Sequence, residues 1–358
     1  MVQNQKFKIA SLFAGCGGLD LGFRKAGFEI VWANDFDKSV WKTHKKNFPK
    51  THFDTRSIID IKSREIPNDI HGIIGGPPCQ SWSLAGAMRG ANDHRGQVFY
   101  EYIRILKDKK PLFFLAENVP GLISKTHFPE FIKLLSEFKR IGYDVDWTTL
   151  NAKDFGVSQE RQRVFILGYK KSLGLQIEFP KPTHGILDPL FSKSKKSNLK
   201  PYVTLKDLIG NMRKAIPAKE RNQPNTNGEL LMPNHEYMIG SFSTIFMSRN
   251  RKKEWDDVSY TIQAGGRHAP IHPSASKMIK VEKDLWKFDT KSKHPYRRLS
   301  IRECARIQSF PDNFIFYYDS IADGYKMVGN AVPVLLAKAI ALKIKTELKK
   351  ASLKTKAV

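Results

Sequence analysis

The chain has 358 residues, and its 41% hydrophobic and 11% aromatic content exclude an intrinsically disordered protein. Its 60 lysines and arginines outnumber 35 aspartates and glutamates, which gives a formal net charge of +25. Such an excess attracts a polyanion and makes nucleic acid the leading candidate partner, with a basic surface that serves solubility or an anionic membrane surface as the alternatives.

The first 170 residues alternate between short strands and helices. Strands are predicted over residues 6–13, 28–33, 72–76, 111–117 and 164–169, and helices over 19–26, 98–107 and 131–141. The strands are short runs that are apolar on both faces, as a buried parallel sheet requires. This alternation predicts an α/β fold with a doubly wound, mostly parallel sheet, whose ligands bind beyond the carboxyl ends of the strands.

The composition changes near residue 171. From there to about residue 295 the chain is rich in Lys, Asn, Pro and Ser and has few periodic segments, which predicts a smaller, irregular domain. Order returns over residues 299–308 and in a final helix near 334–348, before a basic tail. We expect three parts, namely a body over residues 1–172, an inserted domain over 173–295, and a return to the body over 296–358.

The three cysteines, Cys16, Cys79 and Cys304, are too few and too scattered for a disulfide framework or a cysteine zinc site. The first ten residues lack the apolar core of a signal peptide, and no apolar run approaches the roughly 18–20 residues that span a bilayer. The basic residues also do not occupy one face of a long amphipathic helix. We therefore expect a soluble protein of a reducing cytosol that does not bind membranes.

A glycine-rich turn, FAGCGG at residues 13–18, joins the first predicted strand to the first helix. Its glycines let backbone N–H groups approach a ligand closely, although many such turns are only tight connections. Asp35 ends the second strand, where a carboxylate either binds two ribose hydroxyls or caps the next helix. Phe36 beside it could pack on an adenine ring. Because G-x-G-G lacks a phosphate-binding lysine, the pattern favours an adenosine-containing ligand over a nucleoside triphosphate.

Three further motifs adjoin predicted strands. In GGPPCQSWS (75–83), two glycines and two prolines fix an unusual backbone path that presents the thiol of Cys79 at the sheet edge. A structural cysteine needs no such scaffold, so we interpret Cys79 as a nucleophile, provided that something lowers its pKa. Glu117 is either a satisfied helix cap or an acid that faces the same cleft. The QERQR segment (159–163), taken by itself, is interpreted as a solvated charged turn.

In chain order, FAGCGG, GGPPCQSWS, ENV, Q-x-R-x-R, RRLSIRECARIQSFP (297–311) and GNAVP (329–333) resemble the cytosine-5 DNA methyltransferases of restriction–modification systems. The resemblance covers about residues 7–170 and 296–347, and the family uses the middle segment to recognise its target sequence. It implies a Rossmann-like methyltransferase fold with a smaller, irregular target-recognition domain. It also implies S-adenosylmethionine as cofactor and S-adenosylhomocysteine as product.

The resemblance implies a covalent reaction on a cytosine that is flipped out of the duplex. Cys79 would add to C6, which makes C5 nucleophilic enough to accept a methyl group. Glu117 would stabilise the charge that develops on the ring near N3, Arg163 would hydrogen-bond O2, and Arg161 would support the same loop. The base that removes the C5 proton is not identified, and a water could serve.

The family pattern also implies which residues hold the cofactor. The ribose would lie on Asp35 and the adenine near Phe36 and Asp54-Thr55, although Asp60-Ile61 could match the same motif. The expected set is Phe13, Ala14, Gly15, Gly17, Gly18, Leu19, Asp35, Phe36, Asp54, Thr55, Pro77, Asn330 and Val332. The histidines of the middle segment lack metal-ligand spacing, so no metal is expected.

Three segments of the middle domain, PNHEY (233–237), SFSTIFMSRNR (241–251) and QAGGR (263–267), resemble the recognition domains of the members that methylate GGCC. Arg249 and Arg267 are favoured as readers of guanine, because arginine can bond both O6 and N7. For Arg251, base and phosphate contacts have equal weight. Gln80 and Ser83, together with residues 86–95, are candidates for a loop that closes on DNA.

These expectations describe a sequence-specific methyltransferase that acts as a monomer on double-stranded DNA in the prokaryotic cytosol and on the nucleoid. A cognate restriction endonuclease would be its functional partner. One alternative is an RNA cytosine-5 methyltransferase of the same fold, which the long basic middle segment disfavours. The other is a non-catalytic DNA-binding protein, which the presence of Cys79, Glu117, Arg161 and Arg163 disfavours.

Overall fold

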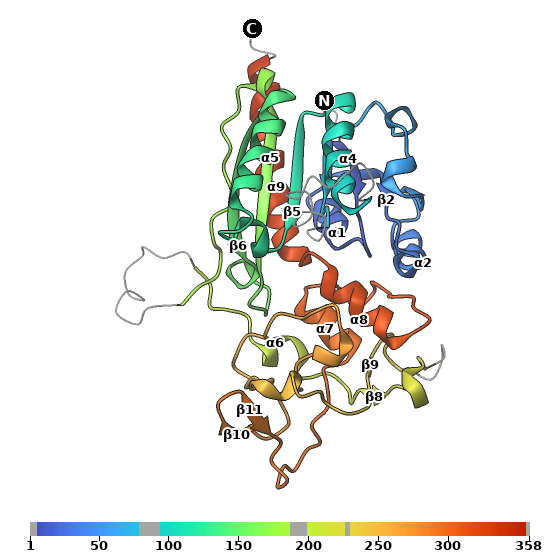
Figure 1. Cartoon of the computed structure of the whole chain (residues 1–358), viewed down its shortest axis with the longest axis vertical. Helices are drawn as coiled ribbons and strands as arrows, with labels where there is room; N and C mark the ends of the chain where they lie inside the picture. The colour runs from blue at the N-terminus through green and yellow to red at the C-terminus, as the bar shows by residue number, and fades with distance from the viewer. Residues whose placement is uncertain (1–5, 79–93, 187–198, 226–229, 356–358) are drawn as a thin grey trace.

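A computed structural model describes residues 6–78, 94–186, 199–225 and 230–355 (Figure 1). Cys79, Gln80, Ser83 and most of residues 86–95 lie outside the described residues.

The larger part of the protein is a sheet of seven strands. Its strands are β1 (Lys8–Leu12), β2 (Glu29–Asn34), β3 (His52–Asp54), β4 (Gly72–Gly75), β5 (Phe113–Asn118), β6 (Tyr143–Asn151) and β7 (Gln162–Lys170). Their order is β3-β2-β1-β4-β5-β7-β6. β1 to β5 are parallel, whereas β7 is antiparallel to both β5 and β6. The doubly wound, mostly parallel α/β sheet is therefore confirmed.

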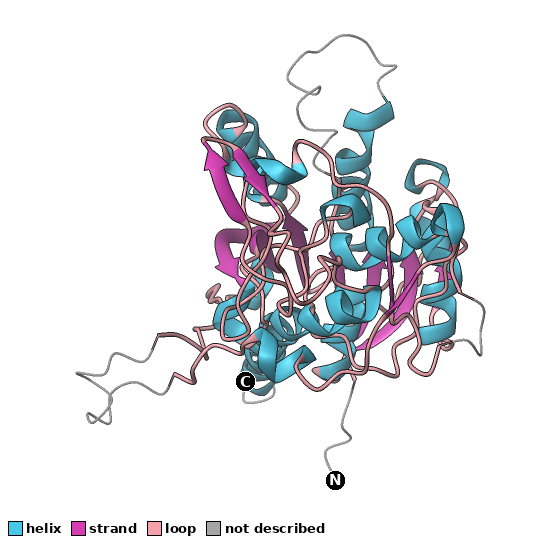
Figure 2. Cartoon of the chain, turned by 90° about the horizontal axis from the view of Figure 1, so that it is seen from below, coloured by secondary structure: helices cyan, strands magenta, loops and turns pink. Residues whose placement is uncertain are grey.

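Helices cover both faces of this sheet, because neighbouring residues of its buried strands point to opposite sides (Figure 2). The helices are α1 (Gly18–Lys25), α2 (Lys38–Asn47), α4 (His94–Lys109), α5 (Phe128–Arg140) and α9 (Val334–Thr355). Ile9 of β1 faces the core under α1 and α9, whereas Ala10 faces the core under α4 and α5.

The smaller part lies beyond the carboxyl ends of the parallel strands (Figure 1). It contains α6 (Leu205–Ile209), α7 (Ile301–Ile307), α8 (Ile321–Asn330), β8 (Ile216–Pro217), β9 (Glu236–Tyr237), β10 (Ile279–Glu282) and β11 (Leu285–Lys287). α7 packs against α6, α8 and β9, whereas α9 packs against α1. We therefore propose that the return to the body begins at α9, later than the residue 296 expected from composition.

One apolar stretch is longer than the sequence predicts. Residues Ile321–Leu353 are long and apolar enough, by length and composition, to cross a membrane, and an 18-residue window within them has a mean hydropathy of 1.6. However, 67% of the window is buried inside the protein, and residues 331–333 divide it into α8 and α9. The expectation that no run reaches this length was wrong, because two consecutive core helices supply it.

Candidate active site

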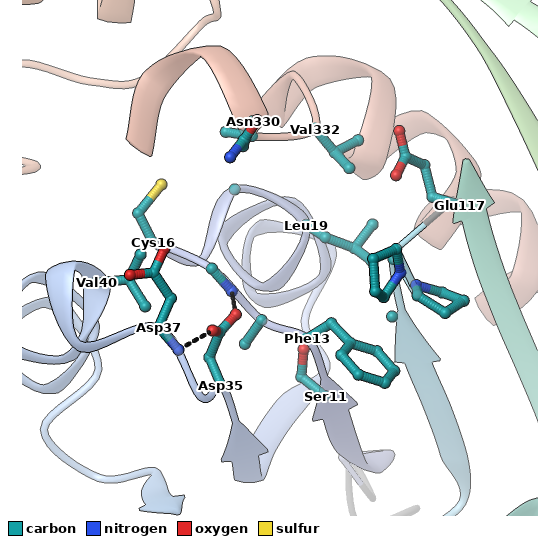
Figure 3. A pocket seen from close by; sticks show the side chains of 18 of the residues that line it. Ser11, Phe13, Cys16, Leu19, Asp35, Asp37, Val40, Glu117, Asn330 and Val332 are labelled. Atoms are coloured by element: carbon teal, nitrogen blue, oxygen red, sulfur yellow. Dashed lines mark hydrogen bonds between the residues drawn. The ribbon is translucent and has the colours of Figure 1, made fainter. Parts of the chain in front are cut away.

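A pocket of about 700 Å³ opens at the carboxyl ends of β1, β2, β4 and β5. One side is the glycine-rich turn with Asp35, and the other side is Asn330 at the end of α8 and Val332 just after it (Figure 3). Glu117, at the end of β5, lines the same pocket. The expected cofactor and catalytic motifs thus meet in one place, at the edge of the sheet where α/β proteins bind their ligands.

The glycine-rich turn depends on backbone conformations and close approaches that glycine allows. Gly17 caps α1 with a φ of 93°, a left-handed conformation that costs most other residues free energy. A Cβ on Gly18 would lie 2.6 Å from the carbonyl oxygen of Val332, so the glycine lets the GNAVP segment contact the turn. Phe13 also has a positive φ, of 54°. Strain of this kind is typical of ligand-binding turns.

The side chain of Asp35 is fixed by two backbone N–H groups, one on each of its carboxylate oxygens. Gly15 donates to its Oδ2 at 2.7 Å, and Asp37 donates to its Oδ1 at 2.8 Å (Figure 3). The residue that caps α2 is Asp37, which accepts from the Ser39 N–H, so the helix-cap interpretation of Asp35 was wrong. Burial raises the pKa of Asp35, although the two backbone hydrogen bonds oppose this.

Most of the expected cofactor residues line this pocket. These are Phe13, Ala14, Gly15, Gly18, Leu19, Asp35, Phe36, Pro77, Asn330 and Val332. Phe36 is 73% exposed, so one face of its ring is free for a flat ligand to pack on.

Three expected residues, Gly17, Asp54 and Thr55, do not line the pocket. The carboxylate of Asp54 is engaged by the Arg56 guanidinium at 2.7 and 3.1 Å, and this pairing holds the pKa of Asp54 below its ordinary value. Ser57 and Ile58 line the pocket instead, and Asp60 does not. The loop after β3 therefore contributes through two of the four residues that lie between Asp54-Thr55 and Asp60-Ile61, the two alternatives that the sequence left open.

The segment that leads to Cys79 is anchored to β5. The Asn118 side chain donates from Nδ2 to the carbonyl oxygen of Pro77 at 2.9 Å. Gly76 lies so close to Glu117 that a Cβ there would be 3.1 Å from Oε2. The sequence analysis predicts Glu117 as a site residue but not Asn118. The position of Asn118 next to Glu117 in the ENV motif could have indicated that it belongs to the site.

Glu117 and Arg163 form an ion pair across neighbouring strands. Arg163 Nε lies 3.0 Å from Glu117 Oε1, and the two side chains are only 13% and 12% exposed. Burial raises the pKa of Glu117, although Arg163 and Arg161 oppose the rise. The carboxyl therefore stays protonated to higher pH than that of a free glutamate, as a proton donor to a heterocycle requires.

The QERQR segment is buried rather than solvated at two of its residues, so its interpretation as an exposed turn was wrong. Arg161 is 1% exposed and donates to the carbonyl oxygens of Ile262 at 2.8 Å and Gly329 at 2.6 Å. Gln159 donates to Gln308 Oε1 at 3.0 Å and accepts from the Ile262 N–H at 2.9 Å. Burial lowers the pKa of Arg161 to about 9. These bonds join the body, the middle segment and the GNAVP turn.

The recognition arginines divide into two kinds. Arg249 and Arg267 are exposed on the smaller part. Arg251 is buried, and its guanidinium donates to the carbonyl oxygens of Phe246 at 2.9 Å and Ile245 at 3.0 Å. Arg251 therefore holds the turn that presents Arg249.

The two cysteines among the described residues are buried. Burial raises the pKa of the Cys16 thiol to about 12, and burial also raises the pKa of Cys304. Neither is a reactive thiolate at neutral pH. No group of three or more His, Cys, Asp or Glu side chains that could hold a metal ion occurs within the described parts of the chain.

Comparisons with known proteins agree with this geometry. The profile of the C-5 cytosine-specific DNA methylase family matches residues 7–346. Type II methyltransferase M.MthTI of Methanothermobacter thermautotrophicus is 58% identical over 341 residues, which are 95% of this chain and 97% of that protein. Type II methyltransferase M.NgoPII of Neisseria gonorrhoeae is 51% identical over 344 residues, 96% of each chain. The crystal structure of a putative DNA modification methyltransferase encoded within an E. coli prophage superposes with a TM-score of 0.72 at 25% identity and covers 96% of this chain and 100% of that one.

Proposed function

This chain belongs to the C-5 cytosine-specific DNA methylase family and is a DNA cytosine-5 methyltransferase of the restriction–modification type. We propose that Cys79, Glu117 and Arg163 perform its reaction and that its target is GGCC. The observation that carries the assignment of residues is the buried Glu117–Arg163 pair, which lies beside the segment leading to Cys79. We further propose that it acts as a monomer on double-stranded DNA in the prokaryotic cytosol, alongside a cognate restriction endonuclease.

The family uses S-adenosylmethionine, and the described pocket fits this molecule. Asp35 offers a fixed carboxylate to ribose hydroxyls, and exposed Phe36 offers a ring to adenine. Backbone N–H groups of the glycine-rich turn and the side chain of Asn330 would complete the contacts. When bound, the cofactor supplies an electrophilic methyl group.

The protein residues act on the cytosine ring. The Cys79 sulfur forms a bond to C6, and the electron pair of the C5–C6 double bond becomes available at C5 for the methyl group. Glu117, in its protonated form, donates a hydrogen bond or proton at N3 and so stabilises the charge on the ring. A base then removes the C5 proton, the double bond forms again, and Cys79 leaves as a thiolate.

Arg163 and Arg161 have separate tasks in this proposal. Arg163 faces the pocket and would hydrogen-bond O2 of the base while it pairs with Glu117. Arg161 acts through its bonds to Ile262 and Gly329, which hold the recognition domain and the GNAVP turn against the catalytic strands. Because it acts through these bonds, Arg161 is a positioning residue. Each buried hydrogen bond from a charged group contributes about 1.5–3 kcal/mol to stability.

Asp35→Ala is expected to raise the dissociation constant for S-adenosylmethionine more than tenfold. The carboxylate would lose two charge-assisted hydrogen bonds to the ribose, each worth about 1.5–3 kcal/mol at most, as well as its hold on Gly15. Titration calorimetry on the protein without DNA measures this directly. Asp60→Ala, which changes a carboxylate outside the pocket lining, is the control. An unchanged constant in Asp35→Ala would leave that residue with a purely structural role.

The proposed GGCC target depends on the exposed arginines of the recognition domain. A base-reading arginine should cost about 1–3 kcal/mol on removal and relax the preference at one position. A phosphate-binding arginine should weaken all sequences alike and reduce the salt slope by about one. Arg251→Ala should instead lower protein stability, because it removes the guanidinium that donates to the carbonyl oxygens of residues 245 and 246.

We expect Arg249→Ala and Arg267→Ala to relax sequence preference, each at one position of the site. Methyl transfer is measured on duplexes with GGCC and with each single-base variant, over a salt series. Lys280→Ala, at an exposed position on β10, is the matched control for loss of one positive charge. A uniform loss over all duplexes would show backbone contacts only. Wild-type enzyme that leaves GGCC open to a GGCC-cutting endonuclease would overturn the target.

A further inference from the structure

An ion pair joins the two parts of the protein at the mouth of the cofactor pocket. Lys326 Nζ lies 2.6 Å from Asp37 Oδ2, and both side chains line the pocket. Asp37 is the N-terminal cap of α2 in the larger part (Figure 3), whereas Lys326 is on α8 in the smaller part. The pair therefore spans the opening between the two parts.

The same two parts are held more firmly farther along α2. Thr43 Oγ1 accepts from the Tyr317 N–H at 2.8 Å and donates to the Tyr317 carbonyl oxygen at 3.1 Å. Asn47 Nδ2 donates to the Ile315 carbonyl oxygen at 2.8 Å. These bonds use buried or half-buried side chains and backbone groups, and Asn47 lies at the end of α2 opposite to Asp37. Opening at the pocket mouth can therefore leave this anchor intact.

The ion pair itself is weak because both side chains are partly exposed to solvent. The side chains of Lys326 and Asp37 are 42% and 34% exposed, and exposed pairs contribute little to protein stability and are screened by salt. Burial raises the pKa of Asp37, but hydrogen bonds from Lys326 and Ser39 outweigh it and hold the pKa below its ordinary value. Asp37 is thus ionised at neutral pH. Its contact with Lys326 can form and break without unfolding either part.

We propose that the Asp37–Lys326 ion pair ties α8 to α2 across the pocket mouth and slows the exchange of S-adenosylmethionine and S-adenosylhomocysteine. The inference rests on the proposed cofactor site. Both side chains line the pocket that holds a ligand between the glycine-rich turn and the end of α8, and both are partly exposed, so breaking their contact loosens the wall on the solvent side of that ligand. A pair of this exposure shifts the closed fraction by roughly two- to fivefold.

The test uses two variants that remove one charge each. Lys326→Met keeps the length of the side chain, and Asp37→Asn keeps the cap of α2, because asparagine caps helices as well as aspartate does. The full-length protein is loaded with S-adenosylhomocysteine and chased with excess labelled S-adenosylmethionine, and the dissociation rate is followed. Both variants should exchange roughly two- to fivefold faster than wild type. High salt should accelerate the wild type and leave the variants unchanged.

The double variant separates a shared interaction from two independent effects. If the two residues act through each other, Asp37→Asn with Lys326→Met exchanges no faster than either single variant. Lys8→Met is the control, since it breaks a similarly exposed pair with Asp69 at the amino end of β1, away from the pocket. Thermal unfolding of every variant is measured alongside, and Asp37→Asn alone carries the test if Lys326→Met does not fold.

The outcomes distinguish the two proposals. Wild-type protein that binds neither ligand overturns the cofactor site itself. Wild-type binding with unchanged exchange in the variants, or additive acceleration in the double variant, overturns the role of the ion pair and leaves the cofactor site standing. Faster exchange in Lys8→Met to the same degree would also overturn it, because the effect would then follow from loss of any surface charge.

Discussion

Replacing Cys79 with serine is expected to lower methyl transfer by about four orders of magnitude or more, since removal of a catalytic nucleophile has effects of this size. A serine hydroxyl is close to a thiol in size but is far less acidic, so it forms almost no nucleophilic anion at neutral pH. Cofactor and DNA binding should remain, because the change is one atom. The remaining cysteines cannot substitute, since burial raises the pKa of Cys16 to about 12 and Cys304 lies in the core.

Single-turnover transfer of a labelled methyl group to a GGCC duplex measures this loss. A duplex that carries 5-fluorocytosine at the target should trap the wild-type enzyme covalently, because fluorine does not leave as the C5 proton does, and Cys79→Ser should give no adduct. Cys304→Ala is the control for loss of a thiol elsewhere. An active serine variant, or an active wild-type enzyme without an adduct, would rule out covalent catalysis.

The sheet was predictable where strands are buried on both faces. β1, β2, β4, β5 and β7 are short apolar runs, and the structure confirms each of them. β3 has three residues, too few to show a period, and β6 is an edge strand whose residues are mostly half-exposed and of mixed polarity. Local sequence reveals a strand that is buried on both faces, because all its residues are apolar. It does not reveal a short or edge strand, because the position of such a strand is set by pairing with its neighbour.

The site was predictable as far as its motifs reach. The glycine-rich turn and Asp35 meet in one pocket because the strands that precede them, β1 and β2, end at the same edge of the sheet, and the GNAVP motif marks Asn330 at the end of α8 as the facing side. The burial of Arg161 was not predictable, since one partner, Ile262, lies 101 residues away and supplies only a backbone oxygen. The same holds for Arg251, whose guanidinium is used within its own turn.

Glu117→Gln is expected to lower the rate of methyl transfer by about 10²–10⁴, the usual contribution of a general acid. Glutamine can still donate a hydrogen bond from its amide, but it has no proton to give to N3 as negative charge develops on the ring after thiolate addition. Affinity for the cofactor should stay near that of the wild type. Glu160→Gln is a matched control, because Glu160 is a nearby carboxylate that pairs with Lys153 at 2.9 Å and is 45% exposed.

The dependence of the rate on pH tests the same role of Glu117, and its direction follows from the pKa. Burial raises the pKa of Glu117, so the active, protonated form persists to higher pH than in a free glutamate, and the rate should fall as pH rises through that raised value. Arg163 opposes the rise, so Arg163→Ala should shift the alkaline limb to still higher pH while it lowers the plateau. Single-turnover rates over a pH series measure both effects. If Glu117→Gln kept the wild-type limb, another group would be the acid, because a residue without a titrating proton cannot produce that dependence.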